Sequence, residues 1–149
     1  MTVKSFVQPA LLSFNFTDDG TYNGPTYPAV NVEGIPDFAI HLAVSALTSG
    51  TPPVADFWLE GTINGSDWFE VFHDGALVHT GTAADTTASA AGNRNINGAA
   101  SAAAAFVAVA QYRNRALQQV RINYEIVLAG GSGSAIGEGS IERLAPRIG

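Results

Sequence analysis

Residues 117–128 read L-Q-Q-V-R-I-N-Y-E-I-V-L, and this stretch decides the fold. From residue 120 onward every second position holds a large apolar side chain: Val120, Ile122, Tyr124, Ile126 and Leu128. A β-strand points successive side chains to opposite faces, so this period predicts a strand with one face in a core and the other in water. Burying each such side chain contributes roughly 1.5–3 kcal/mol. The strand therefore needs a second apolar surface to pack against.

The length and the composition favour one self-sufficient domain over residues 1–149. A chain of 149 residues without cysteine can bury a sizeable core without disulfides, and it offers no thiolate for a metal site or for nucleophilic catalysis. Only 13% of the residues are charged, which is about half the usual share. Either partners or sister copies cover part of the surface, or threonine, serine and asparagine alone keep it hydrated.

The charge balance narrows the range of partners. The formal net charge is −6 and the sequence has no basic run, so we expect no nucleic-acid partner. Arg113, Arg115 and Arg121 lie close together in the sequence, where they either grip an acidic neighbour or form a solvated face. The first residues lack the apolar core of a signal peptide, and no apolar run approaches membrane-spanning length. We therefore expect synthesis in the cytoplasm and no membrane partner.

Alternating apolar residues predict further short strands. We expect them at residues 3–8, 11–17, 38–47, 54–63, 67–73, 76–80, 106–112 and 135–144. Asn64-Gly65 joins two of these segments and is a strong hairpin signal, because both residues tolerate positive φ. This hairpin is rich in tryptophan and phenylalanine, so it is the expected aromatic centre of the protein. Asp74-Gly75 predicts a second hairpin that leads into 76–80.

Two segments depart from this pattern. Residues 18–37 are rich in proline and glycine, which disfavours a central strand and indicates a surface loop or arm. Tyr22 and Tyr27 in this segment either contact a partner or fold back on their own sheet. Residues 81–105 are low-complexity sequence in which Ile96 is the single large apolar residue, and we favour a loop there over a short helix. Together these features predict an all-β, antiparallel β-sandwich, jelly-roll or immunoglobulin-like, with an extended N-terminal arm and a long Ala/Gly-rich loop.

No arrangement of residues in the sequence points to catalysis. His41, His73 and His79 lie on separate predicted strands and lack metal-ligand spacing, so isolated histidines are the expectation. A carboxylate pair is conceivable on the hairpin, where Asp56 and Glu60 lie close to Asp67 and Glu70, but three of these acids are expected to face solvent: Asp56, Glu60 and Glu70. We expect no enzyme activity, no metal and no cofactor.

Two loops invite a binding interpretation that their patterns do not support. Asp18-Asp19-Gly20 and Asp37 offer oxygens for a weak calcium site but lack the spacing of an EF-hand. The run G-G-S-G-S at 130–134 lacks the lysine and the helix of a phosphate loop, so it is expected to be a linker.

Two pieces of the chain resemble small virion proteins of tailed bacteriophages. Residues 60–71, E-G-T-I-N-G-S-D-W-F-E-V, match a strand and turn of the type S-x-D-G-x-x-W-x-x-V, with Asn64 in place of the usual aspartate. Within residues 118–134, Val120 to Val127 match a late strand of the type Y-V-R-V-x-Y-x-V before a Gly/Ser-rich turn. The resemblance implies a β-sandwich that decorates or cements a capsid, commonly as a trimer. The segments 18–37 and 81–105 depart from the pattern.

From this resemblance we expect a structural protein on the capsid surface of a virion, with sister copies and the major capsid protein as partners. The candidate contact residues are Phe6, Tyr22, Tyr27, Ile96 and Arg113. A tail or neck component of a virion is the first alternative. A carbohydrate-binding module is the second, with Trp58 or Trp68 as a stacking platform, although we expect at least one of these rings in the core.

Overall fold

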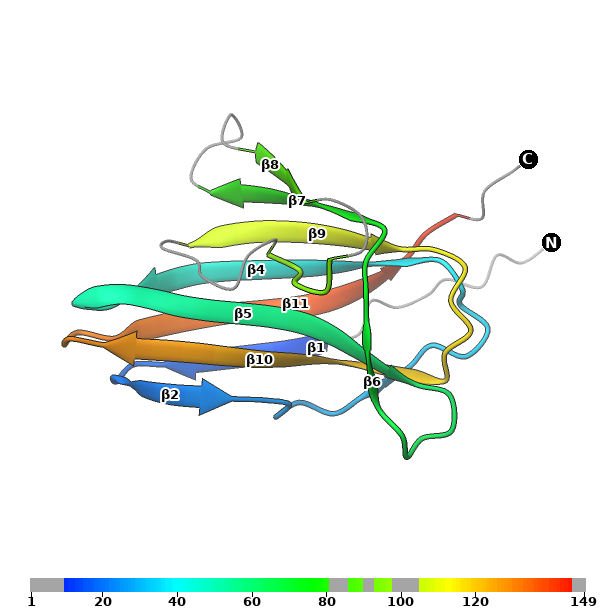
Figure 1. Cartoon of the computed structure of the whole chain (residues 1–149), viewed down its shortest axis with the longest axis horizontal. Coiled ribbons are helices and arrows are strands. Elements are labelled where there is room, and N and C mark those ends of the chain that lie inside the picture. The colour runs from blue at the N-terminus through cyan, green and yellow to red at the C-terminus, as the bar shows by residue number, and fades with distance from the viewer. Residues whose placement is uncertain (1–9, 81–85, 90–92, 98–104, 146–149) are drawn as a thin grey trace.

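The computed structural model describes residues 10–80, 86–89, 93–97 and 105–145. Two antiparallel sheets pack against each other, which confirms the predicted β-sandwich (Figure 1). Sheet A has the strand order β1-β11-β4-β9-β7-β8, and sheet B has the order β2-β10-β5-β6, with β3 also paired to β10. The strands are β1 (Ala10–Phe16), β2 (Gly20–Asn23), β3 (Val30–Asn31), β4 (Phe38–Thr48), β5 (Thr51–Thr62), β6 (Phe69–Val71), β7 (Gly75–Thr80), β8 (Thr86–Ser89), β9 (Phe106–Tyr112), β10 (Gln119–Ala129) and β11 (Ser134–Arg143).

Strand β10 lies inside sheet B and supplies one wall of the core. Its alternate apolar residues from Val120 to Leu128 are all buried, as their period predicts. They face β4 and β11 of sheet A, whose inward side chains include Phe38, Ile40 and Ile141. The two sheets thus hide one side chain in two from water, and this burial is the main stabilising contribution to the fold.

The aromatic core differs from the prediction. Phe57 is the hairpin's one fully buried aromatic residue, and it stacks on Phe14, which in turn stacks on Tyr124. Trp58 and Trp68 are only half-buried, so the expectation of a core tryptophan was wrong. For Trp58 the reason is that successive side chains of a strand point to opposite faces: Phe57 points inward, so Trp58 must point outward.

Both chain crossings between β4 and β5 and between β10 and β11 lie at one end of the sandwich. The amide of Gly50 donates to the carbonyl of Gly131 at 2.7 Å. A Cβ at position 50 would collide with the backbone of Gly130, which itself has φ +85. Glycine is therefore required where the two corners touch.

The proline-rich segment 18–37 lies along sheet B. Its strands β2 and β3 both pair with β10, at the edge of the sheet rather than at its centre. Tyr22 stacks on Phe16 with ring centroids 3.9 Å apart, so this tyrosine folds back on its own sandwich. The predicted strand at 3–8 lies outside the described residues.

The expected hairpin at Asp74-Gly75 was wrong. After β6 the chain leaves sheet B, and β7 pairs with β9 and β8 in sheet A (Figure 1). Within the predicted loop 81–105, the described residues are β8, the segment 93–97, which ends in a turn at residues 96–97, and residue 105; the rest of that loop lies outside the described ranges. Among the described residues, no helix is long and apolar enough to cross a membrane.

Candidate interaction surface

The outer face of sheet A is built from rows of side chains that cross its strands. One row runs Ser140, His41, Val109 and Leu77, and the next runs Glu138, Ala43, Val107 and His79. Strand β9 alternates buried and half-buried residues, so its two valines project outward while Phe106 and Ala108 project inward. We call the surface formed by Ala43, Leu77, Val107 and Val109 the valine face.

The valine face lies in a part of the sheet without formal charge. None of the residues in β4, β7, β8 and β9 is Asp, Glu, Lys or Arg. Leu77 is 51% exposed, and the two valines are half-buried. An antiparallel sheet with one solvated face usually alternates apolar and polar residues. Contiguous exposed apolar surface on a small domain marks an interaction site.

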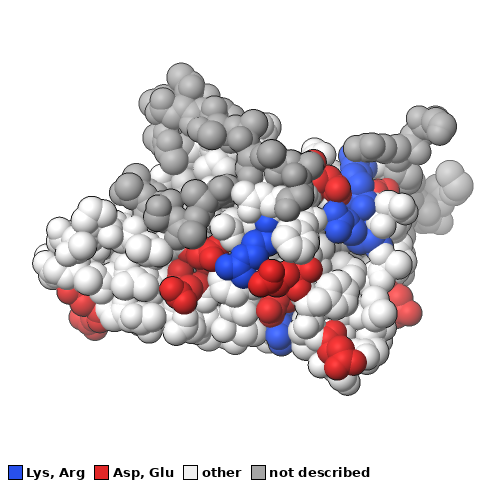
Figure 2. Space-filling model, viewed as in Figure 1, with Lys and Arg blue, Asp and Glu red and all other residues white. Residues whose placement is uncertain are grey.

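The outer face of sheet B has the opposite chemistry. Figure 2 shows basic and acidic side chains interspersed across it. Arg121 of β10 donates to Glu60 of β5 at 2.8 Å, and its guanidinium lies 3.9 Å from the centre of the Trp68 ring. These charges neutralise one another and cover an aromatic surface, as expected for a hydrated face.

Segment 93–97 closes this face beyond the end of β6. Trp58 and Asn95 form an isolated β-bridge, and the amide of Ile96 donates to the carbonyl of Phe57 at 2.8 Å. The side chain of Ile96 is fully buried in the core. It therefore offers no surface to a partner, and the candidate contact predicted at this residue does not fit the structure.

Arg94 pairs with an acidic residue on each of two strands. Its guanidinium donates to Asp56 of β5 at 2.9 Å and to Glu70 of β6 at 2.6 Å, and it lies 4.3 Å from the centre of the Trp58 ring. Burial raises the pKa of the Asp56 carboxyl above its ordinary value, although Arg94 opposes this shift. The expectation that Asp56 faces solvent was wrong, because Arg94 covers it from a segment far away in sequence.

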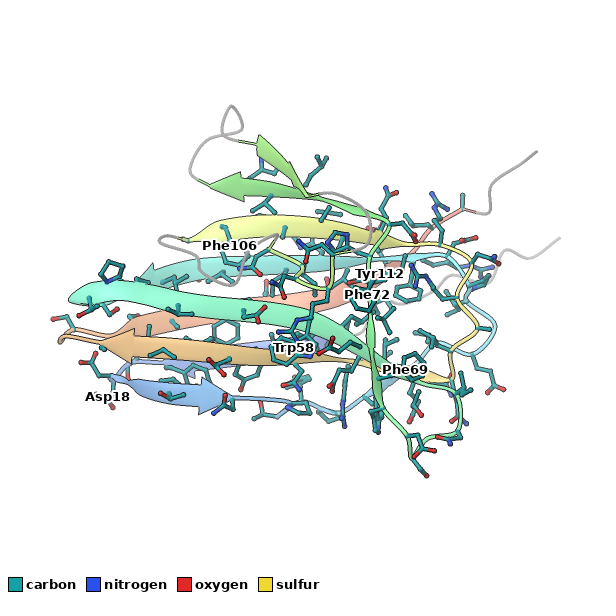
Figure 3. The ribbon with its side chains drawn as sticks, in the orientation of Figure 1. Asp18, Trp58, Phe69, Phe72, Phe106 and Tyr112 are labelled. Carbon is teal, nitrogen blue, oxygen red and sulfur yellow. The ribbon has the colours of Figure 1, made fainter. Side chains whose placement is uncertain are left out.

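The tryptophans are poorly suited to stack on a sugar. A guanidinium lies over each ring, Arg94 over Trp58 and Arg121 over Trp68. Figure 3 places Trp58 on the outer side of sheet B, within this charged layer. Binding a saccharide there would require both arginines to leave their carboxylates.

The predicted contact residues do not form one surface. Tyr22 lies at the edge of sheet B, and Tyr27 lines an open hollow of about 440 Å³ on the outer side of β1, β11 and β4. Arg113 follows β9, where its amide donates to Asp74 and its guanidinium donates to the carbonyl of Ala145. Phe6 lies outside the described residues. The sequence signal for the valine face was present in β9, where both sets of alternate residues are apolar as far as Ala110.

The predicted isolated histidines occupy separate positions. His41 and His79 flank the valine face, whereas His73 is buried. The Nδ1 atom of His73 accepts a hydrogen bond from the amide of Gly75, so its Nε2 atom donates to the carbonyl of Asn95. Burial lowers the pKa of His73 below its ordinary value. Within the described ranges, no three His, Asp or Glu side chains gather as metal ligands.

The aspartates considered as calcium ligands in two loops accept hydrogen bonds from backbone amides of other loops. Asp19 accepts a hydrogen bond from the amide of Gly131 at 2.7 Å, and Asp37 accepts one from the amide of Asn114 at 2.9 Å. Both carboxylates thus tie loops that lie far apart in sequence.

Comparison with known proteins gives no relative. No protein-family model, no curated protein and no solved structure matches this chain.

Proposed function

We propose that this chain is a structural virion protein, a capsid decoration or cement subunit that associates with copies of itself and with the major capsid protein. The observation that carries the proposal is the valine face on charge-free strands of sheet A. Covering an apolar sheet face lowers the free energy of the system, whereas on the opposite face of the sandwich arginines already pair with acids of the same chain. The resemblance of residues 60–71 and 118–134 to phage virion proteins supplies the setting.

The mechanism requires no chemistry. A subunit that binds only assembled shells stabilises the shell by mass action, because rupture must also release the bound subunits. We expect a homotrimer, a location on the capsid surface and no cofactor. Enzyme activity is not part of the proposal.

Solution mass tests the association. Sedimentation velocity over a wide concentration range should show a reversible oligomer, and co-sedimentation with empty shells of the major capsid protein from the same genome should show binding. The change Val107→Glu places a charge in the valine face and should shift the mass toward the monomer. A monomer at every concentration that also leaves the shells uncoated would overturn the proposal.

The matched control is Val54→Glu. Val54 is an exposed valine on the outer face of sheet B. Its strand β5 has a neighbouring strand on each side, as β9 with Val107 has in sheet A. This change adds the same charge without touching sheet A, so the native mass should persist. Equal loss of association in both variants would show that added charge, and not the valine face, controls assembly. A ring of six subunits would favour the tail or neck alternative.

A further inference from the structure

Segment 93–97 brings several polar side chains together beside β5. Trp58 and Asn95 form an antiparallel bridge, Arg94 donates to Asp56, and Asn97 Nδ2 donates to the carbonyl of Ala55 at 3.0 Å, so the segment lies against residues 55–58 of β5. Phe57 points into the core, so its neighbours Asp56 and Trp58 point outward, and Asn95, opposite Trp58, lies on that side.

Oxygen atoms at this place lack hydrogen-bond donors. Asp56 Oδ1, Asn95 Oδ1 and Asn97 Oδ1 are all buried and have no partner. The remaining polar atoms of two of these residues are occupied, since Asp56 Oδ2 accepts from Arg94 and Asn97 Nδ2 donates to the carbonyl of Ala55. Asp56 and Asn97 are only 8% and 9% exposed. A buried acceptor without a partner loses its hydrogen bonds to water and destabilises the fold, so water or an ion is expected to fill such a place.

The surrounding charge favours a cation over water. Glu125 of β10 lies opposite Asp56 in the ladder of sheet B, and Glu70 lies on the other side of Arg94. Asp56, Glu70 and Glu125 are three carboxylates near one guanidinium, that of Arg94. Among the described residues this leaves a local excess of negative charge, which an added cation would reduce.

We propose that Asp56 Oδ1, Asn95 Oδ1 and Asn97 Oδ1 bind a hard divalent cation of the Ca²⁺ type. Carboxylate and amide oxygens are the ligands that Ca²⁺ prefers, and Ca²⁺ accepts irregular geometry and waters in its remaining positions. The cation links segment 93–97 to β5 at the point where β6 has ended. Because it binds the folded chain, it stabilises that chain by mass action.

Terbium luminescence tests the site directly, because Tb³⁺ occupies Ca²⁺ sites and Trp58 lies next to this one. Titration with Tb³⁺ should give saturable emission on excitation of tryptophan, and Ca²⁺ should displace it. The changes Asp56→Asn and Asn97→Ala should each weaken Tb³⁺ binding about tenfold or more, which corresponds to the loss of one ligand contact. The native protein should also melt at a higher temperature in CaCl₂ than in EDTA.

Glu60→Gln is the matched control. Glu60 lies on the same strand and the same face as Asp56 and also pairs with an arginine, but it has no unpaired oxygen at this place. This variant should keep native Tb³⁺ affinity. A second variant, Trp58→Phe, should lose the sensitised emission and keep the Ca²⁺-dependent rise in Tm.

Two results would overturn the proposal. One is the same Tm in CaCl₂ and EDTA together with no saturable Tb³⁺ emission, which would mean that water fills the place. The other is equal loss of Tb³⁺ affinity in Glu60→Gln and Asp56→Asn, which would point to general surface charge. The test does not depend on the association state, so it stands apart from the proposed function.

Discussion

The outer strand faces of the two sheets follow the same alternation but carry opposite chemistry. On β5 of sheet B the outward residues include Asp56, Trp58 and Glu60 as well as Val54, and arginines from other segments bind both acids. On β9 of sheet A the outward residues are Val107, Val109 and Gln111, and none of them is an acid, a lysine or an arginine. The inward residues build one shared core, so folding alone does not require this difference. Segments of the chain itself cover much of the outer face of sheet B, whereas our proposal is that another molecule covers the outer face of sheet A.

The largest expected effect is on the free energy of unfolding, and it concerns the packing of segment 93–97 against sheet B. The change Ile96→Ala removes a fully buried side chain that anchors segment 93–97 in the core. We expect a loss of about 2–5 kcal/mol in the free energy of unfolding, measured by urea denaturation. Ile63→Ala is the control, since Ile63 is 66% exposed and should change little. A similar small change for both would mean that Ile96 does not anchor the segment.

The next effect concerns the ion pairs of the same segment. The change Arg94→Ala leaves the largely buried Asp56 carboxylate without its partner, and we expect a loss of about 2 kcal/mol because Arg94 is itself 32% exposed. Arg94→Lys should recover only part of this, since one ammonium cannot reproduce the two separate contacts to Asp56 and Glu70. Chemical denaturation of the three proteins measures both steps. Full recovery by lysine would show that charge alone matters.

A pH effect arises where the chain crosses from sheet B to sheet A. The pKa of His73 is lowered below 6.5 by burial, so the unfolded chain takes up the proton first. Stability is therefore complete above 6.5 and falls as the pH drops through and below that value. Urea midpoints between about pH 7.5 and about pH 5.5 should show the fall, and His73→Gln should remove it. A flat profile in the native protein would contradict this.

Asp56 changes stability with pH in the opposite direction to His73. Its pKa is raised above 3.8, so its contribution to stability is present below that value and is lost as the pH rises. Asp56→Asn should remove this component and leave the fall due to His73 in place. The two variants therefore separate the two groups.

The smallest expected effect on stability belongs to the valine face. The change Leu77→Ser should alter the free energy of unfolding of the monomer by no more than about 0.5 kcal/mol, as is usual for exposed positions. It should nevertheless weaken self-association in sedimentation velocity. Ile63→Ser removes a comparably exposed apolar side chain from the hairpin loop and should leave the mass unchanged. Native mass in Leu77→Ser would remove this leucine from the interface.

Much of the fold was predictable because inward and outward side chains alternate along a strand, and this alternation can be read from neighbouring residues in the sequence. The period of 117–128 predicted which residues of β10 are buried, and the Asn64-Gly65 signal predicted the hairpin from β5 to β6. The same alternation could also have placed Trp58 on the outer face, since Phe57 points into the core. Neighbouring residues do not, however, determine which of the two sheets a strand joins. Asp74-Gly75 has the composition of a turn, but nothing in it says that β7 joins the other sheet.

The arginine contacts were not predictable from the sequence for a similar reason. Arg94 is 38 residues from Asp56 and 24 from Glu70, and it lies in a low-complexity segment that gives no period. Only the register of segment 93–97 on β5 brings these charges together. By contrast, the valine face was predictable in principle, because β9 is apolar at both sets of alternate positions from Phe106 to Ala110.

The pairing of β1 with β11 has a practical consequence. Ala10 lies opposite Ser140, so the first and last described strands begin and end at the same end of the sandwich. A short linker could join these ends, and a circular permutant opened in the Asn64-Gly65 turn would keep every strand pair intact.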